Sequence, residues 1–296
     1  MNFQIINFAM KLGCHVDGAD EGFDILASSS WFEKSMIEVK HVPINHKPSS
    51  LNSIDVTIME AARRHQEIVL NSLKNQDFPC SFGGDHTCGI GGTSAALEYY
   101  NDDVTIIWLD AHADTHTPKT SPSKHIHGMP CAILQDLCDA PLNQSTYPLK
   151  PERLVYVGLN SFEDEEMNHI KNNNIAMLTA NLIRSQEHNI TLDWIRSSIK
   201  TKYVYLSFDF DVLSKDEFFA VNVNMDETYT NPLGLSLSDV HSIMSMLFRE
   251  YKVVGCDVVE YNPRLDPKHN DLPKVIQTLE HIVNLVKEDA NDKTTI

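Results

Sequence analysis

Short apolar segments alternate with longer amphipathic segments along most of this chain, and that alternation restricts its fold more than any other feature. The apolar segments have the length of strands, and the segments between them carry apolar residues at helical spacing. Strands that alternate with helices of this length form a sheet of mostly parallel strands with helices on both faces. The sequence therefore predicts an α/β fold with a mostly parallel central sheet.

The same pattern assigns each element to a stretch of sequence. The predicted strands are residues 3–9, 78–82, 104–109, 154–159, 175–178, 203–208 and 253–259. The predicted helices are residues 54–74, 90–100, 130–137, 163–172, 192–200, 240–251 and 275–287, with another beginning within 23–32. Ser236 or Ser238 is expected to cap the helix at 240–251. Because no linker, composition shift or repeat divides the chain, residues 1–296 are expected to form one domain.

A dense group of acid and imidazole side chains, Asp110-Ala111-His112-Ala113-Asp114, directly follows the predicted strand 104–109. In extended backbone Asp110, His112 and Asp114 point to the same face. Carboxylates are rarely buried without a charged partner or a metal ion. Three metal-type ligands at the carboxyl end of a buried strand therefore indicate a metal site more strongly than they indicate packing.

Two other predicted strands end in the same kind of residue. Asp209 and Asp211 follow strand 203–208, and His86 follows a Gly-Gly turn after strand 78–82. A lone Asp-x-Asp is usually a turn or a helix cap, but three such motifs at strand ends make that reading improbable. Four carboxylates and two imidazoles are too many for one tetrahedral zinc ion. They favour two divalent cations that share carboxylates, manganese in particular.

Charge and cysteine content exclude several classes of partner. The formal net charge is −17, from 24 basic and 41 acidic residues, which argues against nucleic acid and anionic membranes and favours a cationic substrate. The six cysteines include no Cys-x-x-Cys pair, as expected for the reduced thiols of a cytoplasmic protein. No apolar stretch is long enough to span a bilayer.

Five ordered motifs resemble those of the arginase/agmatinase (ureohydrolase) family. They are GGDH at 83–86, DAHAD at 110–114, HGMP at 127–130, SFDFD at 207–211 and VVEYNP at 258–263. The resemblance implies a three-layer α/β/α fold, a homotrimer or homohexamer, and two Mn²⁺ ions per subunit. It places one ion on His86, Asp110, Asp114 and Asp209, and the other on His112, Asp110, Asp209 and Asp211.

The resemblance also implies hydrolysis of a guanidinium group to urea and an amine. Glu260 would pair with the substrate guanidinium, Asp211 would relay a proton to the leaving nitrogen, and His127 would exchange protons with solvent. Taken alone, Glu260 reads as a cap or surface acid, and His127 as a loop histidine.

Substrate choice is expected to depend on the loop 115–126. His116, Ser123 and His125 match the family positions that bind an amino-acid carboxylate, although the family typically has Asn where His116 and His125 stand. Glu163 matches an acid that faces the α-ammonium group. The preferred substrate is therefore L-arginine, giving L-ornithine, with agmatine, guanidinobutyrate and formiminoglutamate as alternatives. The simpler interpretation is that His116 and His125 are solvated and contact nothing.

Two readings from other classes compete with a ureohydrolase. A non-catalytic regulatory or assembly subunit is disfavoured because all six ligand positions are filled. A metal-dependent deacetylase of related fold would use one zinc ion and fewer carboxylates, and Asp114 and Asp211 speak against it.

Overall fold

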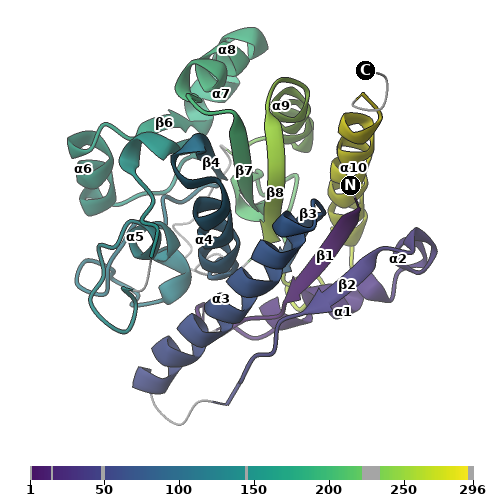
Figure 1. The fold of residues 1–296 in the computed structure, drawn as a ribbon, viewed down its shortest axis with the longest axis horizontal. Coiled ribbons are helices and arrows are strands. Elements are labelled where there is room, and N and C mark those ends of the chain that lie inside the picture. Colours follow the sequence, from purple (N-terminus) through teal and green to yellow (C-terminus); the bar gives the residue numbers. More distant parts are fainter. Residues whose placement is uncertain (1, 15, 48–50, 144–145, 222–233, 293–296) are drawn as a thin grey trace.

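The computed structural model describes residues 2–14, 16–47, 51–143, 146–221 and 234–292. Its centre is an eight-stranded sheet in the order β2-β1-β3-β8-β7-β4-β5-β6, in which every strand pair is parallel (Figure 1). The strands are β1 Phe3–Phe8, β2 Glu38–His41, β3 Phe78–Gly83, β4 Val104–Leu109, β5 Leu154–Leu159, β6 Ala176–Thr179, β7 Tyr203–Asp209 and β8 Lys252–Val259. The predicted α/β fold is confirmed, and the sheet is wholly rather than mostly parallel.

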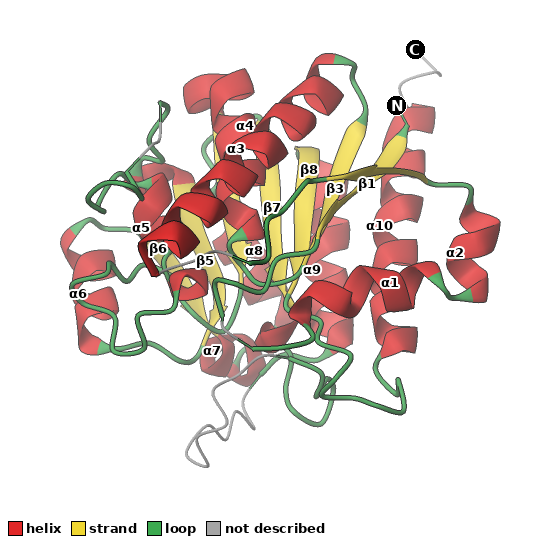
Figure 2. Cartoon of the chain, turned by 90° about the horizontal axis from the view of Figure 1, so that it is seen from below, coloured by secondary structure: helices red, strands yellow, loops and turns green. Residues whose placement is uncertain are grey.

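Helices cover both faces of the sheet and complete the three predicted layers (Figures 1 and 2). One face is covered by α3 Leu51–Lys74, α4 Cys88–Tyr100, α5 Pro130–Leu134 and α6 Asp164–Asn172. The other face is covered by α1 Gly22–Ala27, α7 Ala180–Ser185, α8 His188–Ser198, α9 Leu237–Glu250 and α10 Leu272–Asp292. Alternate strand residues face opposite cores, since Trp108 packs toward α3 and α4 while Leu109 packs toward the other layer.

The order of the central strands explains where the metal-type residues meet. The chain passes from β3 to β4 across two positions that β8 and β7 fill later, so β3, β8, β7 and β4 are neighbours. Because all the strands are parallel, their carboxyl ends lie along one edge of the sheet. Each predicted motif follows one of these four strands, except the loop that carries His127. The topology alone therefore brings distant parts of the sequence together at this edge.

One predicted helix differs from the structure and two elements were not predicted, each for a local reason. The segment 23–32 forms two short helices rather than one, α1 and α2 Ser30–Ser35, and α2 begins at an N-cap whose Ser29 hydroxyl accepts from Phe32 N. The edge strand β2 was not predicted because its sequence, EVKH, has a single apolar residue and lies half exposed. The short helix α7, which starts at a Thr179 cap, was also missed.

Other elements shift by a few residues at their ends. Helix α3 begins at Leu51, α4 at Cys88 and α10 at Leu272, while the helix expected to reach residue 137 ends at Leu134. Ser236, rather than Ser238, caps α9, and its hydroxyl accepts from Asp239 N at 3.1 Å. The sequence also predicts a long irregular loop at 214–232, of which residues 222–232 lie outside the described part of the chain.

The expectations for the cysteines and for membrane-spanning segments can also be compared with the structure. All six cysteines are free thiols, as predicted, and all six are also buried. Within the described ranges, the helices are all too short or too polar to cross a bilayer.

Candidate binuclear metal centre

All six predicted ligand side chains lie at the carboxyl edge of the sheet. His86 follows β3, the group 110–114 follows β4, and Asp209 and Asp211 stand at the end of β7 and in the 3₁₀ turn Phe210–Val212. Potential ligand atoms of His86, Asp110 and Asp114 lie within 4.8 Å of one another, and so do those of Asp110, His112 and Asp211. Asp110 belongs to both groups, so the two clusters share one carboxylate.

The first cluster is built around one nitrogen of His86. Carboxylate oxygens of Asp110, Asp114 and Asp209 lie 3.0, 3.0 and 3.1 Å from His86 Nδ1. The other ring nitrogen, Nε2, lies 2.9 Å from Ser207 Oγ. None of those three contacts has the geometry of a hydrogen bond.

Two buried atoms in this cluster have no hydrogen-bond partner among the described residues: His86 Nδ1 and Asp114 Oδ2. Buried polar atoms are normally satisfied by a hydrogen bond or a bound ion. One imidazole nitrogen surrounded by three carboxylate oxygens is the arrangement that a divalent cation requires. The side chains in this first cluster therefore fit a cation.

The second cluster is more open. His112 Nδ1 lies 2.8 Å from Asp211 Oδ2 and 3.7 Å from Asp110 Oδ1, and the His112 side chain is 34% exposed. The four carboxylates are almost fully buried. A cation in this cluster would therefore be reached from solvent on the His112 side.

The backbone around the clusters is shaped for close approach. A Cβ atom on Gly84 would lie 1.8 Å from Met10 O, so only glycine fits the turn that leads to His86. Asp114 has φ +50° and Glu260 has φ +68°, a left-handed conformation that few non-glycine residues adopt. Strained residues of this kind gather at functional sites.

Electrostatics also favours a cation at this edge. Burial, and then the charge of Asp110, raise the pKa of Asp211 to about 7. Burial, followed by the charges of Asp211 and Asp110, raises the pKa of Asp209 well above its ordinary value. Burial and the Asp110 charge likewise raise the pKa of Asp114. A bound divalent cation reverses this effect because it attracts the ionised form of each carboxylate.

Glu260 and His127 are brought together beside the first cluster. Glu260 is buried at the end of β8, and its Oε1 accepts a hydrogen bond from His86 N at 2.8 Å and lies 3.0 Å from His127 Nδ1. Burial lowers the pKa of His127, but the hydrogen bond and charge of Glu260 outweigh it, so the pKa is raised. The side chain of His127 is 25% exposed and can exchange protons with water.

Three supporting residues were missed in the sequence. Trp108 donates from Nε1 to Asp110 Oδ2 at 2.9 Å and stacks on His86 at a ring distance of 4.3 Å. Ser207 holds His86 Nε2, as described above, and Asp85 accepts a hydrogen bond from Gly13 N at 2.7 Å. Trp108 and Ser207 each precede an acidic ligand by two residues in a strand. That period-2 placement was the signal for them.

The predicted substrate residues lie in two pairs, His116 with Glu163 and Ser123 with His125. His116 Nε2 lies 3.0 Å from Glu163 Oε2 and its Nδ1 lies 3.1 Å from Thr120 Oγ1, so the alternative interpretation, in which His116 contacts nothing, was wrong. The His125 ring lies 5.9 Å from that of His127. Ser123 is exposed, and its hydroxyl accepts from His125 N at 3.2 Å.

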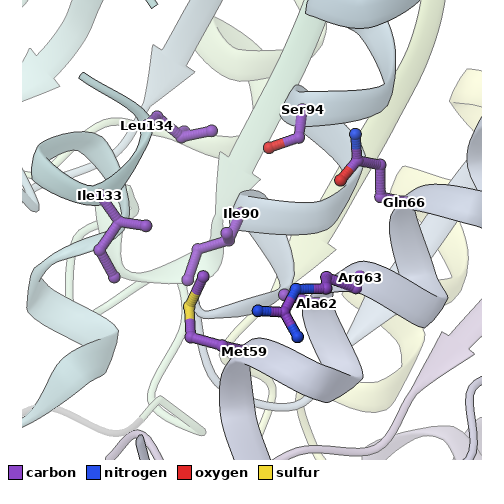
Figure 3. Close-up of a pocket in the computed structure, with 8 residues that line it drawn as sticks. All are labelled: Met59, Ala62, Arg63, Gln66, Ile90, Ser94, Ile133 and Leu134. Carbon is purple, nitrogen blue, oxygen red and sulfur yellow. The ribbon is translucent and has the colours of Figure 1, made fainter. Parts of the chain in front are cut away.

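A pocket elsewhere on the molecule has different chemistry. It lies where α3, α4 and α5 meet, and Figure 3 shows the side chains that line it. They are Met59, Ala62, Arg63, Gln66, Ile90, Ser94, Ile133 and Leu134. None carries a carboxylate or an imidazole, so this pocket has no ligand for the proposed cations.

Comparisons with known proteins agree with this arrangement. The family model described as "Arginase family" matches residues 2–287. An arginase from Staphylococcus aureus is 32% identical over 264 residues, covering 86% of this chain and 82% of the relative. An arginase from Bacillus subtilis is 27% identical, covering 94% and 96% of the two chains. A crystal structure of Bacillus subtilis arginase superposes with a TM-score of 0.83 at 26% identity, covering 95% and 98% of the two chains.

Proposed function

The chain belongs to the arginase family, and we propose that it is a manganese enzyme that hydrolyses L-arginine to L-ornithine and urea. The family supports the coarser statement directly: the protein is a hydrolase of the ureohydrolase type. We also propose that residues 1–296 form one arginase-type domain. The observation that carries the proposal is the buried carboxylate of Glu260, held against the candidate metal cluster through His86 N.

Two Mn²⁺ ions would be held by the residues already described. His86, Asp110, Asp114 and Asp209 would bind the first, and His112, Asp110, Asp209 and Asp211 the second. When bound, the ions would supply Lewis-acid chemistry, which lowers the pKa of a water molecule enough for it to attack a guanidinium carbon. Oxygen-rich ligand sets with one imidazole per ion favour manganese over softer metals.

Glu260 would bind and orient the guanidinium group. A carboxylate and a guanidinium pair through two parallel N–H···O bonds, which fix the plane of the substrate as well as its position. The backbone N–H of His86 and the ring of His127 both hold Oε1 in place. Glu260 would therefore point the substrate toward the ligand cluster without reorganising.

Proton transfer would use Asp211 and His127. Asp211 lies 2.8 Å from His112 Nδ1 at the more open cluster and would move a proton from the attacking water to the leaving nitrogen. His127, partly exposed and paired with Glu260, would pass a second proton between solvent and the departing amine. The products would leave as urea and a protonated amine.

Residues of the loop 115–126 favour a substrate with an anionic tail. This loop includes two lysines and two histidines but no aspartate or glutamate. Agmatine, whose tail is cationic, fits this loop poorly. Guanidinobutyrate and formiminoglutamate both carry a carboxylate and are the closest rivals.

Product release over a substrate panel tests the proposal. The holoenzyme with Mn²⁺ should release urea from L-arginine at a higher kcat/KM than from agmatine. Formamide release from formiminoglutamate, without urea from arginine, would assign the rival activity. No hydrolysis of any of these compounds by protein containing two Mn²⁺ ions would overturn the proposal and favour a non-catalytic subunit.

A further inference from the structure

The loop that follows Asp114 is tied to α6 through one imidazole. His116 Nε2 lies 3.0 Å from Glu163 Oε2, and Glu163 is the N-cap residue of α6. His116 Nδ1 lies 3.1 Å from Thr120 Oγ1 within the same loop. Both ring nitrogens of His116 therefore have protein partners, so His116 can bind a substrate only by giving up one of them.

A second carboxylate fixes the same junction. Glu166 is 3% exposed, and its Oε1 accepts a hydrogen bond from Thr115 N at 3.1 Å, directly after Asp114. Its Oε2 accepts from Glu163 N at 3.3 Å and lies 3.7 Å from His116 Nε2. The start of α6, the loop and the metal-type motif are thus one hydrogen-bonded unit, and His116 lies inside it.

The family resemblance assigns Glu163 to the α-ammonium group of the substrate. The Glu163 side chain is 53% exposed. Its Oε2 is already engaged by His116, so an incoming ammonium group competes with an existing contact. The Glu163 side chain also takes part in the capping box at the start of α6, so turning toward an ammonium group would break its contacts with both His116 and the helix.

Resting on the proposed function, we propose that His116 is a positioning residue that holds Glu163 away from the substrate. The pocket then selects a guanidino substrate by its carboxylate and not by its α-ammonium group. The substrate class is ω-guanidino carboxylic acids, with or without an α-amino group. The carboxylate of the substrate then faces the loop 115–126, in which the His125 ring lies 5.9 Å from that of His127.

Three substrates of one chain length separate the two recognition elements. L-Arginine has both groups, 5-guanidinopentanoate lacks the α-amino group, and agmatine lacks the carboxylate. For the manganese-loaded enzyme, kcat/KM should differ less than 10-fold between L-arginine and 5-guanidinopentanoate, and agmatine should be at least 100-fold poorer than both. A preference of 10-fold or more for L-arginine over 5-guanidinopentanoate would overturn the proposal.

Two variants locate the effect at the His116–Glu163 contact. His116→Asn should release Glu163 and raise the preference for L-arginine over 5-guanidinopentanoate at least 5-fold, through KM and not kcat. Glu163→Gln should change the KM for L-arginine less than 3-fold in the parent enzyme, yet abolish the gain when combined with His116→Asn. A rise of 10-fold or more in that KM for Glu163→Gln alone would show that Glu163 already binds the ammonium group and would refute the proposal.

Control and binding measurements separate this inference from the proposed function. Lys119→Gln alters a charge of the same loop whose partner is Asp139 at 2.7 Å, and should leave the substrate ratio unchanged. Affinities of the holoenzyme for L-ornithine and 5-aminopentanoate, measured by calorimetry, should agree within 10-fold. This comparison tests recognition of the α-ammonium group even if the enzyme releases no urea. A failure to release urea would overturn the proposed function alone. Tighter binding of ornithine by 10-fold or more would overturn the inference alone.

Discussion

Replacing Asp211 with asparagine should stabilise the metal-free protein and destabilise the manganese-loaded one. The change keeps the shape of the side chain but removes one charge from a group of buried carboxylates. Burial and the Asp110 charge raise the pKa of Asp211 from 3.8 to about 7. That difference corresponds to about 4 kcal/mol against the ionised form above pH 7.

The pH dependence gives this prediction a definite sign. An acid whose pKa is higher in the folded state than in the unfolded state costs nothing below pH 4, where both states are protonated. The cost grows between pH 4 and pH 7 and is complete above pH 7. Metal-free Asp211→Asn should therefore gain little at pH 4 and most at pH 8.

The expected shift can be measured by thermal unfolding in the presence of a chelator. Weakening the contact with His112 offsets about 1 kcal/mol, which leaves a net gain of about 3 kcal/mol. For a chain of this length 1 kcal/mol is about 2 °C, so the variant should unfold about 6 °C higher at pH 8. Mn²⁺ at about 1,000 times Kd should reverse the order, because it adds about 4.1 kcal/mol per site and the variant loses one of the two sites.

A metal-free variant no more stable than the parent at pH 8 would refute the electrostatic argument. A variant that gained as much from Mn²⁺ as the parent would show that Asp211 does not bind the ion.

Three further changes test other parts of the site and the fold. Glu260→Gln should keep the full manganese content but lower kcat/KM for the guanidino substrate about 100-fold or more, since it weakens a buried charge pair; unchanged turnover would remove Glu260 from the pocket. Trp108→Phe deletes the donor to Asp110 Oδ2 and should weaken Mn²⁺ binding about 10-fold in a titration, whereas an unchanged affinity would make the contact incidental. Burial, and then the charge of His281, lower the pKa of His241 to about 4. As the pH falls from about 6.5 to about 4, the unfolded chain is protonated at this histidine before the folded chain is, so the parent loses stability. His241→Gln removes this loss. The free energy of unfolding of the variant, measured by chemical denaturation, should therefore fall below that of the parent by less at pH 4.5 than at pH 7.

The location of the candidate site followed from the sequence because it depends on few details of the fold. Any mostly parallel sheet places the carboxyl ends of its strands at one edge. The groups at His86, Asp110 and Asp209 were therefore expected on the same edge, and the neighbouring positions of β3, β8, β7 and β4 bring them together there. The buried apolar strands, such as 104–109, were equally easy to assign because each is bounded by polar turns.

The contacts that act between distant segments could not be predicted in this way. His116 and Glu163 are 47 positions apart, and their contact depends on how α6 docks beside the loop after Asp114. The placement of β8 and β7 between β3 and β4 could not be predicted either, because the sequence of a single strand does not indicate which strands are its neighbours. Polar or short elements, β2 and α7 among them, lacked the apolar period on which the sequence reading relies.

Manganese stoichiometry combined with electron paramagnetic resonance tests the central claim most directly. Dialysed protein titrated with Mn²⁺ should bind two ions per chain and give the spectrum of an exchange-coupled pair, since ions that share carboxylates lie about 3.5–4 Å apart. Asp209→Ala should lose both ions, whereas Glu260→Gln should keep both. Binding of a single uncoupled ion, or a coupled pair that survives in Asp209→Ala, would contradict the account.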